Sequence, residues 1–526
     1  MKKRVEFLGY AVLSGFLFWL GWPPHAVPIS LFFALIPLFI LEKRLMAVDR
    51  GSAFFGYLYL GLLIANVSTT WWVWNASNGG AVFMALANSF LMSIPFLFYK
   101  FTKKVVGQQK ALMAFVFYWL AFEYFHFNWP VSYPWLTLGH GFAASPNLVQ
   151  WYEYTGVLGG SLYILLANVL IFNLFRDKSR SKSAVAALWL LVPLMWSWYL
   201  GSRQDGCKKT KFEVLVIQPN IDPYEKFNYG AGLGQMEKFI ELAERNITEQ
   251  TQLVILPETA VVENVNEEEL PRNRSLRMLA SFSRKHNVPI LTGAATYQFH
   301  RGPEETWPSW HRKTPEGSIY SSYNTALLID STGVVELYHK SRLVPGVESL
   351  PFPAFFKFFD KILHLDFGGM SGQLGSSPKA MSFPINHSTS KSIAPLICYE
   401  SIYGEYVKDF VNDGATMMAV ITNDGWWGNT PGHVQHMHYA RLRAIEFRRY
   451  VVRSANTGIS CVIDDNGRVS HQTKYWEEAA FTAKINPLNY VTYYSQHGDY
   501  LGRIASFLGI FMILGAAVRN KTKKGY

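Results

Sequence analysis

Residues 393–401 read IAPLICYES, an apolar run that ends in a cysteine, a tyrosine and a glutamate. Such a run is typical of a buried strand, which places Cys398 at the strand's end. Two other strand-like runs end in the same way, because LVILPE reaches Glu258 and VVELYHK reaches Lys340. Strand ends are where α/β domains present catalytic groups, since the sheet fixes the backbone while the loop side stays accessible.

The surrounding region, residues 202–496, alternates strand-like runs with amphipathic stretches. Helical patterns lie at 233–245, 276–285, 403–411 and 434–447. This alternation predicts a layered α/β domain with buried strands, in which periodicity does not separate parallel from antiparallel pairing. The expected strands are FEVLVIQ (212–218), LVILPE (253–258), PILTGA (289–294), NTALLID (324–330), VVELYH (334–339), IAPLICYE (393–400), MMAVITN (417–423), VVRSAN (451–456) and SCVID (460–464).

A cysteine, a lysine and a carboxylate brought together would form a nucleophilic site. Glu258 can take the thiol proton, Lys340 can hold the thiolate and then an oxyanion, and Cys398 can carry an acyl group. Taken singly, each residue has a plainer explanation. A cysteine after an apolar strand is usually buried and inert, and a charged residue at a strand end is usually solvated.

Composition excludes several other kinds of site. The chain has 526 residues with a formal charge of +11, but many basic residues lie in short segments between apolar stretches, a pattern that does not indicate nucleic acid binding. The three cysteines, Cys207, Cys398 and Cys461, show no CxxC or Cys/His spacing, which argues against a disulfide framework or a zinc site. No HExxH or phosphate-binding GxxxxGK[ST] motif occurs, so we expect no metal and no cofactor.

The remaining residues are apolar enough to cross a membrane repeatedly. A spanning helix needs about 20 apolar residues. We expect eight spans, seven of them in a first domain at 1–201, before the soluble domain at 202–496, and one in a C-terminal segment at 497–526. They lie at about 7–20, 27–41, 53–73, 81–98, 112–127, 156–175, 184–200 and 501–518.

Basic residues alternate between the connecting loops. The loops at 21–25, 75–80 and 128–154 contain no Lys or Arg, whereas the alternate loops and both ends are basic. By the positive-inside rule both ends are cytoplasmic, and residues 202–496 lie on the opposite side of the membrane. The basic residues are Lys2, Lys3, Arg4, Lys43, Arg44, Arg50, Lys100, Lys103, Lys104, Lys110, Arg176, Lys178, Arg180, Lys182, Arg519, Lys521, Lys523 and Lys524.

Residues 351–365, PFPAFFKFFDKILHL, carry more apolar groups than an ordinary connecting loop. One interpretation is a helix packed on the domain's own core. The alternative is a lipid-facing arm that dips into the membrane surface and admits an acyl chain, for which basic residues among apolar ones are typical. The candidate substrate-binding residues of this arm are Phe355, Phe356, Phe358 and Phe359.

The segments LPETA, HKSRLVPGVESLP and ICYES, in this order, resemble the Glu, Lys and Cys signatures of the nitrilase, or carbon–nitrogen hydrolase, superfamily. With seven spans before them and one after, nearly the whole chain resembles the apolipoprotein N-acyltransferases, the membrane-bound members of that superfamily. The resemblance implies an αββα sandwich for the extracytoplasmic domain and a catalytic triad of Glu258, Lys340 and Cys398.

The same resemblance suggests supporting residues. Glu348 takes the place of the family's second glutamate, and Tyr399 and Glu400 follow the nucleophile as they do in the family. The Tyr399 amide is then the partner of Lys340 in the oxyanion hole, and Trp426, in NDGWW, is a candidate substrate contact. NDGWW is richer in Gly and Trp than the family pattern, and residues 298–320 have no clear counterpart, which leaves substrate selectivity open.

The resemblance also implies a reaction, in which Cys398 takes an acyl group from a phospholipid, expected to be the sn-1 chain of phosphatidylethanolamine. The thioester then passes it to the α-amine of the diacylglyceryl-cysteine of an apolipoprotein. The expected place is the bacterial inner membrane, with the catalytic domain periplasmic. Two alternatives remain: a membrane-tethered amidase or nitrilase that hydrolyses a small amide, and a transporter with a soluble regulatory domain. Almost no ionisable groups lie within the spans, which disfavours the transporter.

Overall fold

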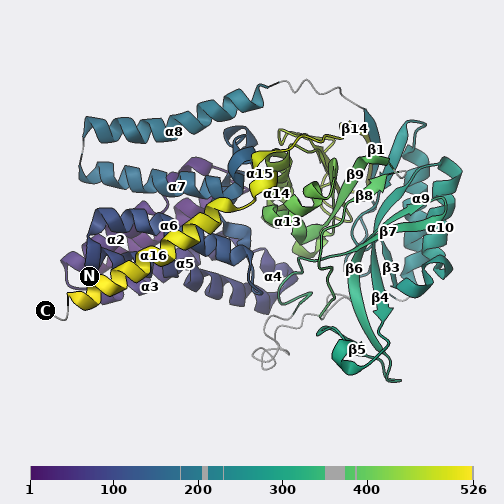
Figure 1. Ribbon diagram of the computed structural model, residues 1–526, viewed down its shortest axis with the longest axis horizontal. Coiled ribbons are helices and arrows are strands. Elements are labelled where there is room, and N and C mark those ends of the chain that lie inside the picture. Colours follow the sequence, from purple (N-terminus) through teal and green to yellow (C-terminus); the bar gives the residue numbers. More distant parts are fainter. Residues whose placement is uncertain are drawn as a thin grey trace. The chain divides into compact units, whose positions relative to one another are not determined.

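The computed structural model describes residues 2–177, 179–203, 211–228, 230–349, 373–385 and 388–523. The chain divides into two compact units, one formed by Met1–Gln204 with His497–Tyr526 and the other by Asp205–Gln496. The first is helical and the second is built from two sheets with helices (Figure 1).

The helical unit contains long apolar helices. Among the described residues, five segments are long and apolar enough to cross a membrane: Gly51–Thr70, Asn78–Val106, Tyr152–Arg176, Arg180–Gly201 and Tyr500–Thr522. The expected spans at 7–20 and 112–127 are also continuous helices. The α-helices are α1 (Lys2–Leu20), α2 (Ile36–Ala47), α3 (Phe54–Thr70), α4 (Val73–Ala76), α5 (Asn78–Val106), α6 (Gln108–Phe127), α7 (Tyr152–Arg176), α8 (Arg180–Gly201) and α16 (Tyr500–Thr522).

The expected second span is not one continuous helix, and that prediction is wrong. Residues Pro28–Phe32 form a 3-10 helix, and α2 begins only at Ile36 and has 12 residues. Prolines at 28 and 37 remove backbone donors that a single helix through this region would need. Twelve helical residues span about 18 Å, less than the roughly 30 Å of a bilayer's hydrocarbon core.

The second unit contains two sheets. The eight-stranded sheet runs β14-β1-β2-β4-β6-β5, with β3 paired to β4 and β7 paired to β6, and the six-stranded sheet runs β13-β12-β11-β10-β9-β8. The strands are β1 (Phe212–Gln218), β2 (Thr251–Ile255), β3 (Val261–Asn266), β4 (Ile290–Phe299), β5 (Arg312–Lys313), β6 (Ile319–Asp330), β7 (Gly333–His339), β8 (Phe383–Ile385), β9 (Ser388–Ile397), β10 (Met417–Thr422), β11 (Val451–Ala455), β12 (Cys461–Ile463), β13 (Val469–Ser470) and β14 (Ala479–Ile485).

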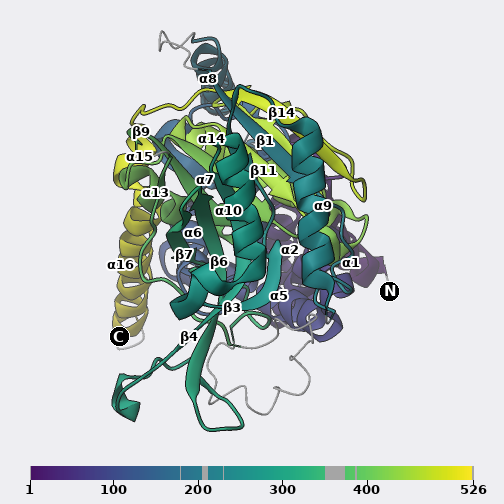
Figure 2. The same ribbon diagram turned by 90° about the vertical axis from the view of Figure 1, so that its right-hand side faces the viewer.

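The layers of this unit follow the order helix, sheet, sheet, helix. Helices α9 (Ala231–Asn246) and α10 (Arg274–His286) lie side by side on the outer face of the eight-stranded sheet (Figures 1 and 2). Helices α13 (Gly404–Asn412) and α14 (Pro431–Phe447) pack on the six-stranded sheet, and β1 faces β11 between the layers. The expected αββα sandwich is confirmed. A short helix, α15 (Tyr493–His497), follows the sheets.

Burial explains why these elements form. Every residue of β1 and of β10 is buried, as the continuous apolar runs FEVLVIQ and MMAVIT require of strands covered on both faces. In α10, Leu276, Leu279 and Phe282 are buried at a helical spacing, and the Asn273 side chain caps the helix by accepting from the Leu276 N–H.

Strand direction brings the functional loops to one edge of each sheet. Strands β9, β10 and β11 are mutually parallel, and β1, β2 and β4 are parallel in the other sheet. Both β4 and β7 run antiparallel to β6, so they point the same way as each other. The residues that follow β2, β7, β9 and β10 are therefore presented from carboxyl ends of strands, where α/β folds place their sites.

Candidate active site

Cys398 begins a short 3-10 helix, Cys398–Ile402, directly after β9. Its φ is 50°, in the left-handed region that non-glycine residues rarely adopt, so the surroundings must hold this turn in place. The Glu400 carboxylate accepts from the Ile397 N–H at 2.9 Å, and the Ser401 hydroxyl donates to the Cys398 carbonyl oxygen at 2.8 Å. Both bonds close the turn around the sulfur-bearing residue.

Lys340 follows β7 and is 1% exposed. Its Nζ lies 2.8 Å from Glu348 Oε1 and 3.4 Å from Glu258 Oε1. Burial by itself lowers the pKa of Lys340, but the carboxylates of Glu348 and Glu258 and the neighbouring Cys398 outweigh it and hold the pKa above its usual value. Lys340 therefore stays a cation at physiological pH.

Glu258 comes three residues after the end of β2 and is held by donors from three directions. Its Oε1 accepts from the Asn324 side chain at 2.7 Å as well as from Lys340, and its Oε2 accepts from the Asn423 N–H at 3.0 Å. A carboxylate fixed in this way can take a proton without first reorganising.

Two further carboxylates support the site, Glu348 from the loop after β7 and Glu400 from the 3-10 helix that begins at Cys398. Besides Lys340, Glu348 accepts from the Val344 N–H at 2.8 Å and the Asn324 side chain at 3.3 Å. Glu400 accepts from the Ser341 N–H at 2.7 Å and from Tyr338, and so ties the lysine loop to the nucleophile turn. Burial raises the pKa of Glu400, although these hydrogen bonds act to lower it.

The charges of Glu258 and Lys340 both affect the pKa of the Cys398 thiol. Withdrawal from water raises the pKa of Cys398 well above its ordinary value, and the Glu258 carboxylate raises it further, whereas the Lys340 ammonium lowers it. The resting sulfur is therefore protonated near neutral pH. A nucleophilic attack by this sulfur needs a base close at hand, and Glu258 is the carboxylate placed for it.

A second lysine lies behind Glu258. Lys226 is fully buried, and its Nζ donates to the Glu258 carbonyl oxygen at 2.8 Å and to Thr259 Oγ1 at 3.0 Å. Burial lowers the pKa of Lys226 to about 7, although the Glu258 carboxylate raises it. Its side chain thus fixes the main chain that carries the base.

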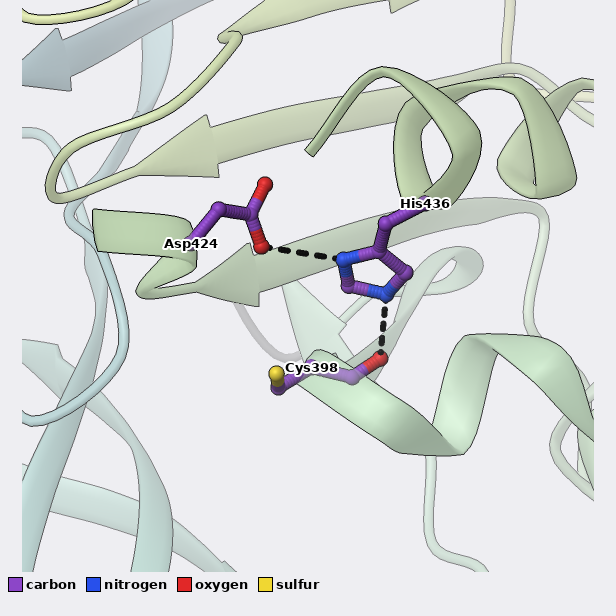
Figure 3. A group of neighbouring side chains, drawn as sticks. All are labelled: Cys398, Asp424 and His436. Carbon is purple, nitrogen blue, oxygen red and sulfur yellow. Dashed lines mark hydrogen bonds and ion pairs between the residues drawn. The ribbon is translucent and has the colours of Figure 1, made fainter. Parts of the chain in front are cut away.

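A buried polar network lies on the other side of Cys398 (Figure 3). His436 Nδ1 is 3.0 Å from Asp424 Oδ1, and its Nε2 is 3.2 Å from the Cys398 carbonyl oxygen. Asp424 also pairs with Arg453, and Asp424, His436 and Arg453 are all fully buried. Burial would raise the pKa of Asp424, but Arg453 and His436 hold it below its usual range, so the carboxylate is ionised.

The Cys398, Asp424 and His436 side chains are close enough together for one ion to reach all three. These three side chains do not favour a metal. Asp424 already pairs with Arg453 and accepts a hydrogen bond from Thr422 Oγ1, and His436 Nε2 faces a carbonyl oxygen. The cations Arg453 and Lys340 near this cluster would also repel a metal ion. We interpret the cluster as a hydrogen-bond network.

Comparison with known proteins places the chain in a family. A carbon–nitrogen hydrolase model matches residues 214–493, and a model of the apolipoprotein N-acyltransferase N-terminal domain matches residues 14–170. A protein from Chlorobaculum tepidum named apolipoprotein N-acyltransferase is 30% identical over 536 residues, covering 97% of this chain and 96% of that protein. The chain belongs to the apolipoprotein N-acyltransferase family.

Further matches include another named relative and a solved structure. The protein of the same name from Geobacter metallireducens is 26% identical over 537 residues, covering 97% of this chain and 95% of that protein. Among solved structures, Saccharomyces cerevisiae Nit3, described as a member of branch 10 of the nitrilase superfamily, is 16% identical and covers 53% of this chain and 90% of that protein, with a TM-score of 0.38.

In this member of the apolipoprotein N-acyltransferase family, the structure brings the predicted Glu258, Lys340 and Cys398 together. Glu348 and Glu400 lie beside them, and Tyr399, 6% exposed, follows the nucleophile. Trp426 lies two residues after Asp424, with its ring 5.2 Å from that of Tyr224. Its contact with substrate stays a prediction. The candidates Phe355, Phe356, Phe358 and Phe359 lie outside the described residues.

Sequence reasoning missed several residues of this apolipoprotein N-acyltransferase site. Asn324 bridges Glu258 and Glu348 from within β6, where a polar residue begins an otherwise apolar run. Lys226, Asp424 and His436 contact the main chain or hydrogen-bond network of the catalytic residues. The available signal was an Asp and a His within NDGWWGNTPGHVQH, directly after a buried strand, which we did not interpret as a pair.

Proposed function

We propose that this enzyme moves a fatty acyl group from a phospholipid onto the N-terminal α-amine of apolipoproteins through a thioester on Cys398. The observation that carries the proposal is the position of Lys340, whose Nζ lies 3.4 Å from Glu258 and 2.8 Å from Glu348 and whose charge acts on the Cys398 thiol. Together with the apolar helices and the named relatives, it supports acyl transfer at a membrane.

In the first half-reaction Glu258 takes the proton of the Cys398 thiol, and the sulfur attacks the ester carbonyl carbon. We take the donor to be the sn-1 acyl group of phosphatidylethanolamine. The oxyanion that forms is stabilised by the Lys340 ammonium and the Tyr399 amide. When the C–O bond breaks, the lysophospholipid oxygen receives the proton held by Glu258 and leaves, and the acyl group remains on sulfur.

In the second half-reaction the α-amine of a diacylglyceryl-cysteine attacks the thioester carbonyl carbon. The same two donors stabilise the second oxyanion. Glu258 accepts a proton from the amine and passes it to the sulfur as the C–S bond breaks, which restores both the thiol and the carboxylate. The product is an N-acylated lipoprotein. Because both steps form an oxyanion that the same donors stabilise, a single site can accept the acyl group and then transfer it.

The thioester must be protected from water between these steps, or the enzyme would act as a hydrolase. From the sequence alone we propose that Phe355, Phe356, Phe358 and Phe359 contact the acyl chain, since an aromatic surface excludes water and receives a hydrocarbon. Trp426 is our candidate for a further substrate contact. We also propose that the catalytic unit lies in the periplasm of a bacterial inner membrane, with both ends of the chain cytoplasmic.

A two-substrate assay tests the proposal. The purified full-length protein is mixed with vesicles of phosphatidylethanolamine that carries different sn-1 and sn-2 chains, and with a diacylglyceryl-cysteine peptide. We expect the peptide to gain the sn-1 chain, and to gain nothing with Cys398→Ala or Lys340→Met. If the wild type instead releases free fatty acid with the peptide unchanged, the chain is a hydrolase and the transfer proposal fails.

A further inference from the structure

The carbonyl oxygen of Cys398 is held by two side-chain donors. Ser401 Oγ lies 2.8 Å and His436 Nε2 lies 3.2 Å from it. His436 comes from α14, more than 30 residues further along the chain, and is fully buried. No step of the acyl transfer described above explains why a buried imidazole contacts the main-chain carbonyl oxygen of the nucleophile.

The contacts of the imidazole determine where its proton lies. A carbonyl oxygen only accepts hydrogen bonds, so Nε2 must carry a proton whenever it bonds to Cys398. On the other edge of the ring, Nδ1 is 3.0 Å from Asp424 Oδ1 and 3.0 Å from Arg453 Nη2. Burial lowers the pKa of His436, so the ring is neutral near pH 7 and carries a single proton. With that proton on Nε2, Nδ1 accepts from the Arg453 guanidinium, and the Nε2–H faces both the Cys398 carbonyl oxygen and Ser401 Oγ, which lies 3.1 Å away.

The orientation of the Cys398 carbonyl also determines the direction of the Tyr399 N–H, which belongs to the same peptide unit. A peptide unit is planar, and in the trans form its N–H points opposite to its C=O. The only cis peptide bond among the described residues is Pro23–Pro24, so the Cys398–Tyr399 peptide is trans. Whatever fixes the Cys398 carbonyl therefore also fixes the direction of the Tyr399 N–H. The φ of 50° at Cys398 means that this orientation is not the backbone's own preference.

We propose that His436 is a positioning residue for the oxyanion hole. It orients the Tyr399 amide by donating a hydrogen bond to the Cys398 carbonyl oxygen. The inference rests on the proposed acyl transfer, because that chemistry forms an oxyanion in both steps. Hydrogen bonds to a carbonyl oxygen also polarise the amide, so the Tyr399 N–H becomes a stronger donor as well as a better directed one. Arg453 serves this function by donating to Nδ1 of the imidazole, and Asp424 serves it by pairing with Arg453.

The geometry separates this role from that of a base. Figure 3 shows the imidazole facing the carbonyl oxygen of Cys398, with the sulfur at the other end of the residue. Glu258, Lys340 and Asp424 are charged groups that act on the sulfur, and a ring nitrogen of His436 lies within 4.8 Å of it. An Nε2 that carries a proton and donates it to the carbonyl oxygen cannot accept the thiol proton. Loss of His436 should then weaken only those reactions of Cys398 that pass through an oxyanion, and leave its other reactions as they are.

Two reagents distinguish these possibilities on the full-length protein. p-Nitrophenyl butyrate acylates a thiol through a tetrahedral oxyanion, whereas iodoacetamide alkylates it by direct displacement and forms none. His436→Met keeps the size of the side chain and removes the donor, and His436→Gln keeps an amide N–H near the position of Nε2. His438→Met is the matched control, since His438 is on the same helix and its Nδ1 contacts Arg441 instead.

We expect butyrylation of His436→Met to be slower by roughly 10- to 100-fold, part of the cost of losing an oxyanion donor. Alkylation should stay within about twofold of wild type, His436→Gln should recover most of the butyrylation rate, and His438→Met should match wild type. If the Met variant does not fold, His436→Asn, whose amide is too short to reach the oxygen, replaces it.

Unchanged butyrylation in the donor-free variant would overturn the inference, and so would an equal loss of butyrylation and alkylation, which indicates a general structural role. Neither reagent is a phospholipid, so the test does not depend on the natural donor. A wild type that accepts p-nitrophenyl butyrate but no phospholipid would defeat the proposed function, while the His436 comparison would still decide the positioning role.

Discussion

At the residue scale, Lys340 is the charge on which the site depends. It is buried, balances Glu258 and Glu348, and acts to lower the pKa of Cys398. Replacing it by Met should raise the pKa of the thiol further, so that iodoacetamide alkylation of Cys398 moves to higher pH. The measurement is the alkylation rate against pH. An unchanged profile would contradict a role for this ammonium beside the sulfur.

The same substitution should affect stability, because it leaves two buried carboxylates without their cation. Breaking a buried ion pair from one side typically costs about 3–5 kcal/mol. Thermal unfolding in detergent should therefore occur at lower temperature in Lys340→Met. In Lys340→Met/Glu348→Gln, where one of the two carboxylates is also removed, part of the loss should be recovered. No recovery in the double variant would argue against direct coupling of the two groups.

Lys226 should give the reaction a pH dependence near neutrality. Its pKa is lowered by burial to about 7, so it is a neutral amine above that value and an ammonium below it. The ammonium beside Glu258 makes that carboxylate a weaker base, and butyrylation should fall as the pH decreases from about 8 to about 6. Lys226→Met should keep its rate to lower pH, and the surface variant Lys238→Met should not. Superimposable profiles for all three proteins would contradict this account.

The sequence indicates some residues of the site more clearly than others. Glu258, Lys340 and Cys398 could be proposed from the sequence because each directly follows a strand-like run and lies in a motif of the family, and their catalytic roles stay predictions. Asn324 and Lys226 contact Glu258 from 66 and 32 positions away, and His436 contacts Cys398 from 38 positions away, so nothing local to them reveals that partner. Their roles depend on tertiary structure, which a single sequence does not determine.

At the element scale, the site depends on close packing of β4 against the residue after β2. A Cβ built on Gly293 would lie 2.4 Å from the Thr259 nitrogen and 2.7 Å from Glu258 Cα. Both are backbone atoms, so Gly293→Ala must displace the loop that carries the base. We expect butyrylation to fall by about tenfold or more, since a small misplacement of a catalytic group is costly.

Gly234, within α9, is the matched control for that change. A Cβ there meets nothing within 4 Å, and alanine is the better helix former by about 0.5–1 kcal/mol. Gly234→Ala should leave butyrylation unchanged and raise the unfolding temperature slightly. Equal activity of the Gly293 and Gly234 variants would show that the loop after β2 tolerates displacement.

The positions of the strands could be predicted better than their directions and pairing. The nine expected strands lie on observed ones because buried strands are continuous apolar runs. The directions of β9 and β10, and the pairing of β7 with β6, could not be predicted, since periodicity is the same in parallel and antiparallel sheets. The break between residues 32 and 36 was hidden by uniformly apolar composition, although the two prolines of that region were visible in the sequence.

At the scale of the whole molecule, the chain combines a unit of helices that are long and apolar enough to cross a membrane with a second unit built as a two-sheet sandwich. The basic ends and loops predict that both termini are cytoplasmic and that the sandwich is periplasmic. In a background where Cys207, Cys398 and Cys461 are all replaced by Ala, a cysteine at Glu304, which is exposed in the second unit, should react with a membrane-impermeant maleimide in spheroplasts. A cysteine at Lys521, in the last turn of α16, should react only after permeabilisation. The reverse pattern would contradict the orientation.

The most direct test of the central claim is the intact mass of the protein after incubation with phosphatidylethanolamine vesicles. The account predicts a gain equal to one fatty acyl group, located on Cys398, released by hydroxylamine and discharged onto a diacylglyceryl-cysteine peptide. Cys398→Ser is expected to give no hydroxylamine-labile thioester, and Cys398→Ala no adduct at all. A folded wild-type protein that acquires no adduct from the phospholipid would contradict the account and favour a membrane-tethered amidase.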